Sequence, residues 1–212
     1  MAPDDARGDA QLVAILRGVT PERARATGLV LYEAGIRIIE VPLNSPDPFD
    51  SIAALASSCP PDCLIGAGTV LKVEDVHCAY AAGGRLVVSP NCDVEVVRCA
   101  LQLAMRVMPG IATATEAFTA ISAGATTLKL FPAVSYGPKH LQALKSVLPR
   151  PVQVYPVGGI GASDIPAWLA AGATGFGFGT ELFHPDYDLA EIDRRARQLV
   201  QALQGALTEG YV

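Results

Sequence analysis

Residues 22–41 read ERARATGLVLYEAGIRIIEV, and they decide the fold class because the periodicity changes at one glycine. The part before Gly35 has the spacing of an amphipathic helix, and Gly35 is the expected left-handed terminator of that helix. The part after it, residues 36–41, is a short apolar run that is typical of a strand covered on both faces. The stretch therefore predicts a helix that leads into a buried parallel strand.

The same junction occurs four times along the chain. The segments EAG, AAG, SAG and AAG place glycines at positions 35, 83, 124 and 172, which are 48, 41 and 48 residues apart. Each interval corresponds to about two strand–helix units. We therefore expect eight strands, at residues 12–16, 36–41, 63–67, 85–88, 105–108, 126–130, 152–156 and 174–178.

Eight parallel strands alternating with helices in 212 residues predict a compact (β/α)8 TIM barrel of the α/β class. We expect one domain, with an N-terminal tail over residues 1–10, the barrel over 11–206 and a C-terminal tail over 207–212. An open doubly wound sheet is the alternative architecture. It is disfavoured because no GxGxxG motif follows the first strand.

The composition excludes several classes of protein. Half of the residues are apolar and 17% are charged, which excludes a disordered chain. The net charge of -5 and the lack of a long basic run argue against nucleic acid as a partner. No apolar stretch reaches the roughly 18 residues of a membrane span, so no membrane is expected either. The acidic N-terminus has no apolar signal core, which predicts a cytoplasmic protein.

Cysteine and histidine spacing gives no sign of a metal site or a disulfide framework. The three histidines stand far apart, and none has a metal-type spacing to a cysteine or carboxylate. The cysteines are odd in number and form no CxxC pair, which predicts reduced thiols buried as small hydrophobic side chains. They are Cys59, Cys63, Cys78, Cys92 and Cys99.

Lys129 is the sharpest single signal for chemistry. It is one of four lysines, and it alone lies inside an apolar strand, TTLKLFP. Burial removes the hydration of an ammonium group, which lowers its pKa toward about 7 to 8, where the free amine can attack a carbonyl. The alternative interpretation is a lysine whose apolar stem extends from the strand end into solvent.

Glu40 is the carboxylate counterpart of Lys129, since Ile38, Ile39 and Val41 surround it in sequence. A carboxyl group in apolar surroundings has a raised pKa and can carry protons. The alternative is a core ion pair, with Arg17 as its partner. In a barrel the chemistry sits at the carboxyl ends of the strands, so Arg, Glu and Lys at three such ends favour a site.

Glycines follow the seventh and eighth expected strands, in Gly158-Gly159-Ile160-Gly161 and in GFGFGT at residues 175–180. Such loops let backbone amides approach an anion, and barrels often bind phosphate between these two loops. No Walker lysine follows them, so a nucleoside triphosphate loop is not expected. The alternative is that the glycines serve only tight turns.

Nine segments, in order, resemble the class I aldolases of the KDPG/KDPGal family. They are LVAILRG, IIEVPLNSP, LIGAGTVL, VVSPN, MPGIATATEA, LKLFPA, GPKHLQALKSVLP, VYPVGGI and GFGT, and they span about residues 11 to 182. The resemblance is greatest to the members that act on 2-dehydro-3-deoxy-6-phosphogalactonate. It implies a Schiff-base aldolase without metal or cofactor, a homotrimer, that cleaves a phosphorylated keto-deoxy sugar acid to pyruvate and glyceraldehyde 3-phosphate.

The resemblance also implies a role for each site residue. Lys129 is the expected Schiff-base lysine, and Glu40 the expected proton donor and acceptor. The remaining residues fall into three groups: Arg17 and Thr69 for the substrate carboxylate, Pro90 and Phe131 for the walls of the pocket, and Gly158, Gly159, Gly179 and Thr180 for the phosphate. Relatives commonly have serine where Thr180 stands, and threonine keeps the hydroxyl group while adding a methyl group.

Three other functions remain open from the sequence. The first is the same reaction on the gluconate epimer, whose enzymes often carry an arginine in a TLRT-like segment where this chain has Pro42-Leu43-Asn44-Ser45. The second is a phosphate-binding barrel isomerase or epimerase, which would use Glu40 but would not need Lys129. The third is a noncatalytic sugar-phosphate binding protein, which could lose either residue.

Overall fold

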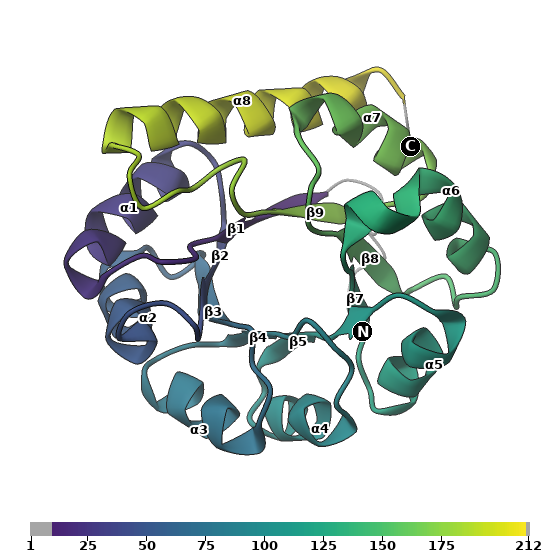
Figure 1. Cartoon of the computed structure of the whole chain (residues 1–212), viewed down its shortest axis with the longest axis horizontal. Coiled ribbons are helices and arrows are strands. Elements are labelled where there is room, and N and C mark those ends of the chain that lie inside the picture. Colours follow the sequence, from purple (N-terminus) through teal and green to yellow (C-terminus); the bar gives the residue numbers. More distant parts are fainter. Residues whose placement is uncertain (1–9, 211–212) are drawn as a thin grey trace.

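Parallel strands form two curled sheets that surround a common centre, with the helices outside them (Figure 1). The computed structural model describes residues 10–210. Its first half contains β1 (Gln11–Ile15), α1 (Pro21–Glu33), β2 (Ile38–Pro42), α2 (Pro48–Ser58), β3 (Leu64–Gly68), α3 (Val73–Ala81), β4 (Leu86–Val88) and α4 (Val94–Gln102). Its second half contains β5 (Arg106–Met108), β6 (Gly110–Ile111), α5 (Ala114–Ser122), β7 (Thr127–Leu130), α6 (Ala133–Lys145), β8 (Gln153–Pro156), η1 (Ala162–Asp164), α7 (Ile165–Ala170), β9 (Gly175–Phe178) and α8 (Leu189–Thr208).

The strand order confirms the α/β prediction and disagrees with the open doubly wound alternative. One sheet has the order β5-β4-β3-β2-β1-β9 and the other has the order β6-β7-β8. A doubly wound sheet reverses its strand order near the middle, whereas here the strands from β1 to β5 and from β6 to β8 pair in sequence order. The last strand, β9, pairs in parallel with the first, β1.

All eight expected strands are present, and one of them is divided. Pro109 interrupts the fifth, so that β5 pairs with β4 while β6 pairs with β7. Proline has no N–H to donate to a ladder, which explains the break. Its carbonyl still accepts a hydrogen bond from Lys129 N at 2.9 Å. At the other edge of the smaller sheet, a parallel bridge joins Val157 to Gly177.

The four repeated glycines adopt the left-handed conformation predicted for them. Their φ angles are 106° at Gly35, 92° at Gly83, 104° at Gly124 and 95° at Gly172. Each follows a helix and precedes a strand, and an L-residue with a side chain would be strained there. The repeat in the sequence therefore marks a repeated turn in the structure.

Apolar side chains fill the interior of the strand ring. Leu86, Met108 and Tyr155 belong to a buried inner cluster, which is separate from the larger core between strands and helices. At the beginning of the strands, the Arg106 guanidinium donates hydrogen bonds to Gln11 Oε1 at 3.1 Å and to the Tyr155 hydroxyl at 3.1 Å. We call this layer of Arg106, Gln11 and Tyr155 the floor of the ring.

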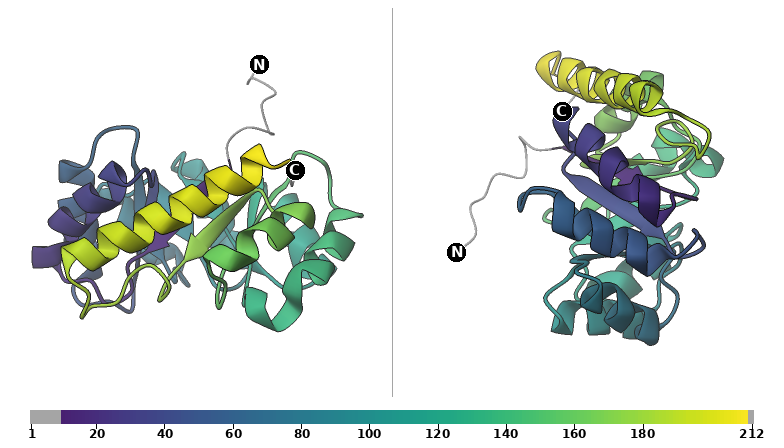
Figure 2. Two further views of the ribbon diagram at one scale, coloured as in Figure 1. Left: turned by 90° about the horizontal axis from the view of Figure 1, so that it is seen from above. Right: turned by 90° about the vertical axis from the view of Figure 1, so that its left-hand side faces the viewer.

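The helices cover the outer face of the strands, and α8 lies across α1 and α7 (Figure 2). Helix α8 ends at Thr208, two residues beyond the expected end of the barrel, because Leu207 packs against the core. Of the expected tails at 1–10 and 207–212, residues 1–9 and 211–212 lie outside the described residues. No helix in residues 10–210 is long and apolar enough to span a membrane.

The prediction that all five cysteines are buried is wrong for Cys78. Its thiol belongs to an exposed position of α3, whereas Cys63 and Cys99 are buried and the other two are half-buried. A helix that packs on only one face presents every third or fourth residue to solvent, which accounts for the difference. All five are free thiols.

Candidate active site

Glu40 and Lys129 project into the strand ring from opposite sheets. Glu40 lies on β2 and is 1% exposed, while Lys129 lies on β7 and is 6% exposed. Side chains two residues apart on a strand share a face, and Ile38 belongs to the inner cluster, so Glu40 faces the interior as well. The alternative in which Lys129 extends into solvent is therefore wrong.

The carboxyl group of Glu40 fills the space that is left by the absence of a side chain at Gly68. A Cβ atom at position 68 would coincide with the Glu40 carboxylate, so only glycine fits at the end of β3. Glu40 Oε2 is buried and has no hydrogen-bond partner among the described residues. Burial raises the pKa of Glu40 to about 7, and the charges of Lys129 and Arg17 oppose this shift without cancelling it.

Lys129 has the complementary shift. Burial lowers the pKa of the Lys129 amine, the nearby Glu40 carboxylate raises it, and the Arg17 guanidinium lowers it again. The Nζ atom lies 4.9 Å from the centroid of the Phe131 ring. A carboxyl group with a raised pKa and an amine with a lowered pKa exchange protons more readily than the free groups do, which suits both to acid–base and nucleophilic chemistry.

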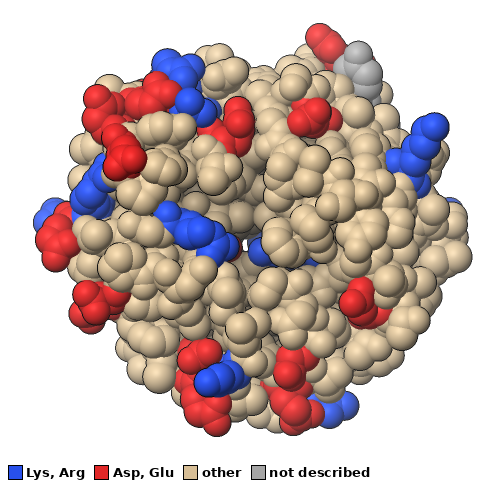
Figure 3. All heavy atoms as spheres, viewed as in Figure 1, with Lys and Arg blue, Asp and Glu red and all other residues tan. Residues whose placement is uncertain are grey.

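Arg17 is not an ion-pair partner of Glu40 in the described residues. Its guanidinium follows β1, is exposed, and donates a hydrogen bond to Asn44 Oδ1. Figure 3 shows a hollow in the centre of the face viewed in Figure 1, with basic side chains on both sides of it. Arg17 follows β1 and Lys129 lies on β7, and their positive charges favour an anion at this end of the ring.

The other predicted pocket residues also follow strand ends. Thr69 comes directly after β3 and has a φ of 56°, a left-handed conformation that is a strained one for a β-branched residue. Such strain is found mainly at functional sites. Pro90 follows β4 and is half-buried, and Phe131 follows β7 and is 37% exposed. The structure therefore places all three at the same end of the strands as Arg17.

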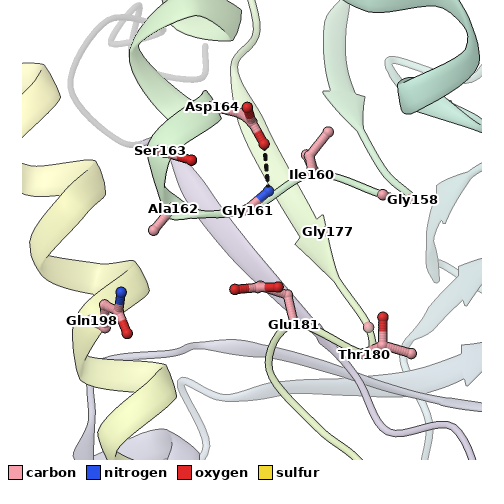
Figure 4. A pocket seen from close by; sticks show the side chains of 12 residues that line it. Gly158, Ile160, Gly161, Ala162, Ser163, Asp164, Gly177, Thr180, Glu181 and Gln198 are labelled. Atoms are coloured by element: carbon pink, nitrogen blue, oxygen red, sulfur yellow. Dashed lines mark hydrogen bonds between the residues drawn. The ribbon is translucent and has the colours of Figure 1, made fainter.

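A second hollow of about 490 Å³ lies between the loop after β8 and the end of β9 (Figure 4). Gly158 and Gly159 have φ angles of 96° and 71°, which require glycine. The backbone N–H groups of Gly159, Gly179 and Thr180 donate no hydrogen bond to another residue within 10–210. Unpaired amides at a glycine-rich loop can hold an anion.

Two acidic side chains that the sequence reasoning missed also line this hollow. Asp164 Oδ2 accepts a hydrogen bond from Gly161 N at 2.7 Å, so that amide is already occupied (Figure 4). Glu181 lies beside Gly161. The lining contains no lysine or arginine among the described residues, so backbone amides, the hydroxyl groups of Ser163 and Thr180 and the Gln198 amide are the donors for an anion here. The Gly161-x-x-Asp164 spacing, which resembles a helix-capping motif, could have revealed Asp164.

Comparison with known proteins identifies the family. The model of the KDPG and KHG aldolases matches residues 5–195. The chain belongs to this aldolase family. A 2-dehydro-3-deoxy-6-phosphogalactonate aldolase of Escherichia coli K12 is 43% identical over 92% of this chain and 96% of its own length. A probable enzyme of the same name from Rhizobium meliloti is 44% identical over 87% of each chain.

Solved structures of the family agree with the fold. A native KDPGal structure superposes with a TM-score of 0.91 at 43% identity, covering 93% of this chain and 96% of that one. A cube-shaped protein cage, designed by fusing symmetric oligomeric domains, contains a domain with a TM-score of 0.93 at 42% identity. It covers 95% of this chain and 74% of the cage subunit.

Proposed function

We propose that this aldolase cleaves 2-dehydro-3-deoxy-6-phosphogalactonate to pyruvate and glyceraldehyde 3-phosphate, through a Schiff base on Lys129. The observation that carries the proposal is the buried pair of Lys129 and Glu40, whose pKa values are shifted toward each other. The E. coli and R. meliloti relatives carry the name of this activity. The enzyme is therefore an aldehyde-lyase of sugar-acid breakdown.

The reaction uses the two buried groups in sequence. The neutral amine of Lys129 attacks the C2 ketone, and Glu40 supplies and removes the protons with which the carbinolamine loses water to form an iminium ion. The Glu40 carboxylate takes the proton of the C4 hydroxyl group as the C3–C4 bond breaks, which releases the aldehyde and leaves the bonding electrons in an enamine. Protonation of the enamine at C3 and hydrolysis of the imine then free pyruvate and Lys129.

Binding energy comes from the two ends of the substrate. Arg17 and Thr69 hold the carboxylate, and Pro90 and Phe131 form the walls of the pocket around the ketone. The unpaired amides of Gly159 and Gly179 and the loops of Gly158 and Thr180 hold the phosphate. No cofactor or metal is needed for these steps, because the iminium ion accepts the electron pair.

Three properties of the molecule complete the proposal. The two sheets act as one closed (β/α)8 barrel and as a single domain over residues 11–206, supported by the divided fifth strand and the Val157–Gly177 bridge. The enzyme is a homotrimer, as the family resemblance implies, and the related cage domain is described as a symmetric oligomer. It works in the cytoplasm, in keeping with five free thiols.

Reductive trapping tests the covalent step directly. Incubation with pyruvate and borohydride should add one reduced pyruvate to the protein, and peptide mass analysis should place it on Lys129, because this amine has a lowered pKa and faces the interior. The same treatment without pyruvate is the control. A modification on Lys72 or Lys139 instead, or none at all, would contradict the Schiff-base mechanism.

The preference between epimers tests the substrate assignment. We expect a higher kcat/KM for the galactonate compound than for its gluconate epimer, because Asn44 places no charge beside the pocket and Arg17 is the cation there. The two substrates differ in one hydroxyl group, so an advantage of about tenfold, or about 1.4 kcal/mol, is the expected size. Steady-state kinetics on the two pure epimers measures it, and a preference for the gluconate compound would reverse the assignment.

A further inference from the structure

The loop after β2 holds the loop after β1 at two adjacent points. The Arg17 guanidinium donates a hydrogen bond to Asn44 Oδ1, and the backbone N–H of Gly18 donates one to Ser45 Oγ at 2.9 Å. Arg17 and Gly18 are consecutive in the sequence, and so are Asn44 and Ser45. The contact therefore fixes the backbone and the side chain of the same short segment.

The backbone of Gly18 has little freedom. Its φ of 85° requires glycine, and a Cβ atom there would lie 2.9 Å from Pro185 Cγ. On the other side Ser45 is 8% exposed and is held by its own turn, in which Ser45 N donates to Pro42 O at 2.9 Å. The starting point of the Arg17 side chain is thus set by buried groups, whereas its guanidinium is exposed.

Asn44 is the group that sets the far end of that side chain. Within the described residues the Arg17 guanidinium has no carboxylate within 4.0 Å, and the Asn44 amide oxygen is its hydrogen-bond acceptor. An amide oxygen fixes one N–H of the guanidinium but leaves its positive charge uncompensated. The other N–H donors of the planar fork stay available for a second anion.

We propose that Asn44 is a positioning residue, which orients the Arg17 guanidinium to receive the carboxylate of the keto acid. The proposal rests on the function proposed above, in which Arg17 binds that carboxylate. A free arginine side chain samples many rotamers, and holding it in advance reduces the entropy lost when the anion binds. The amide does this without the competing charge that an aspartate would bring.

Loss of the amide should weaken carboxylate binding and leave the chemistry intact. In Asn44→Ala, we expect the pyruvate concentration for half-maximal borohydride trapping, and the KM of the sugar acid, to rise about tenfold. The value of kcat should stay within about twofold, because Lys129 and Glu40 are unchanged. Inhibition by inorganic phosphate, which tests the other end of the substrate, should not change.

Two further variants separate positioning from a general structural effect. In Asn44→Asp the acceptor oxygen is kept but an ion pair forms with Arg17, so pyruvate binding should weaken at least as much as in Asn44→Ala. Asn91→Ala is the matched control, since Asn91 is also an exposed asparagine after a strand, and its side chain makes no hydrogen bond within residues 10–210. It should leave pyruvate binding unchanged.

A double-mutant cycle decides the proposal. If Asn44 acts through Arg17, Asn44→Ala should have no further effect on pyruvate trapping once Arg17→Ala is present. Equal effects of Asn44→Ala in both backgrounds, or a loss of kcat at unchanged KM, would overturn the positioning role. Absence of pyruvate trapping in the unaltered enzyme would instead overturn the proposed function, and this inference with it.

Discussion

Replacing Lys129 with alanine is expected to lower kcat/KM by about a millionfold, the size of effect seen when an enzyme loses its covalent nucleophile. The reason is that β7 supplies a single buried amine to the interior of the ring, and no imine can form without it. Measurement of pyruvate release, together with borohydride trapping, checks both consequences. Both should fall to background.

Two further variants test whether loss of the fold, instead of loss of the amine, explains this result. Lys129→Met keeps the length and the apolar contacts of the stem, so it should fold as the parent does and be as inactive as the alanine variant. Lys139→Ala removes an exposed lysine of α6 and should keep full activity. Turnover that survives in Lys129→Met would exclude Schiff-base catalysis at this residue.

Glu40→Gln is expected to lower kcat by about a hundredfold to ten-thousandfold, the usual contribution of a positioned proton carrier. In the unaltered enzyme kcat/KM should rise with pH through about 7, because the carboxyl group must ionise before it can accept a proton and its pKa is about 7. Glutamine does not titrate, so this limb of the pH profile should disappear. Near-normal kinetics would return Glu40 to a structural role.

The same substitution should change how stability depends on pH. The pKa of Glu40 is about 7 in the fold and 4.5 is its ordinary value, so the folded state holds the proton more tightly between these limits. The stability that Glu40 contributes is present below about pH 4.5 and is lost as the pH rises through 7, an amount of about 3 kcal/mol. Urea unfolding at pH 4 and pH 8 measures this, and Glu40→Gln should lack that part of the loss.

Site residues could be predicted from the sequence where a charged residue lies among apolar neighbours. Lys129 and Glu40 were predicted as site residues because each places a charge inside an apolar strand, and the structure finds both buried and shifted in pKa. The eight strands were predicted for a related reason. Strands covered on both faces are continuously apolar, and left-handed glycines mark where the preceding helices end.

Features that depend on contacts between distant segments were not predicted. Arg17 and Asn44 are 27 residues apart, and their hydrogen bond depends on how two loops meet above the strands. Gly68 lies in the LIGAGTVL segment, but its need for glycine follows from the position of the Glu40 carboxylate on the neighbouring strand β2. The proline that causes the break at position 109 is visible in the sequence, but no local pattern encodes which neighbouring strand β5 and β6 each pair with.

The floor of the ring sets the order in which products leave the enzyme and substrates enter it. Below Lys129 lie the inner cluster and the floor of Arg106, Gln11 and Tyr155, so under the proposed mechanism the substrate enters from the opposite end, where Arg17, Thr69 and Phe131 lie. Under the proposed mechanism the pyruvate fragment is tethered at the inner end, and the aldehyde lies between it and the exit. Cleavage must then release the aldehyde first, and the reverse condensation must load pyruvate before the aldehyde can follow.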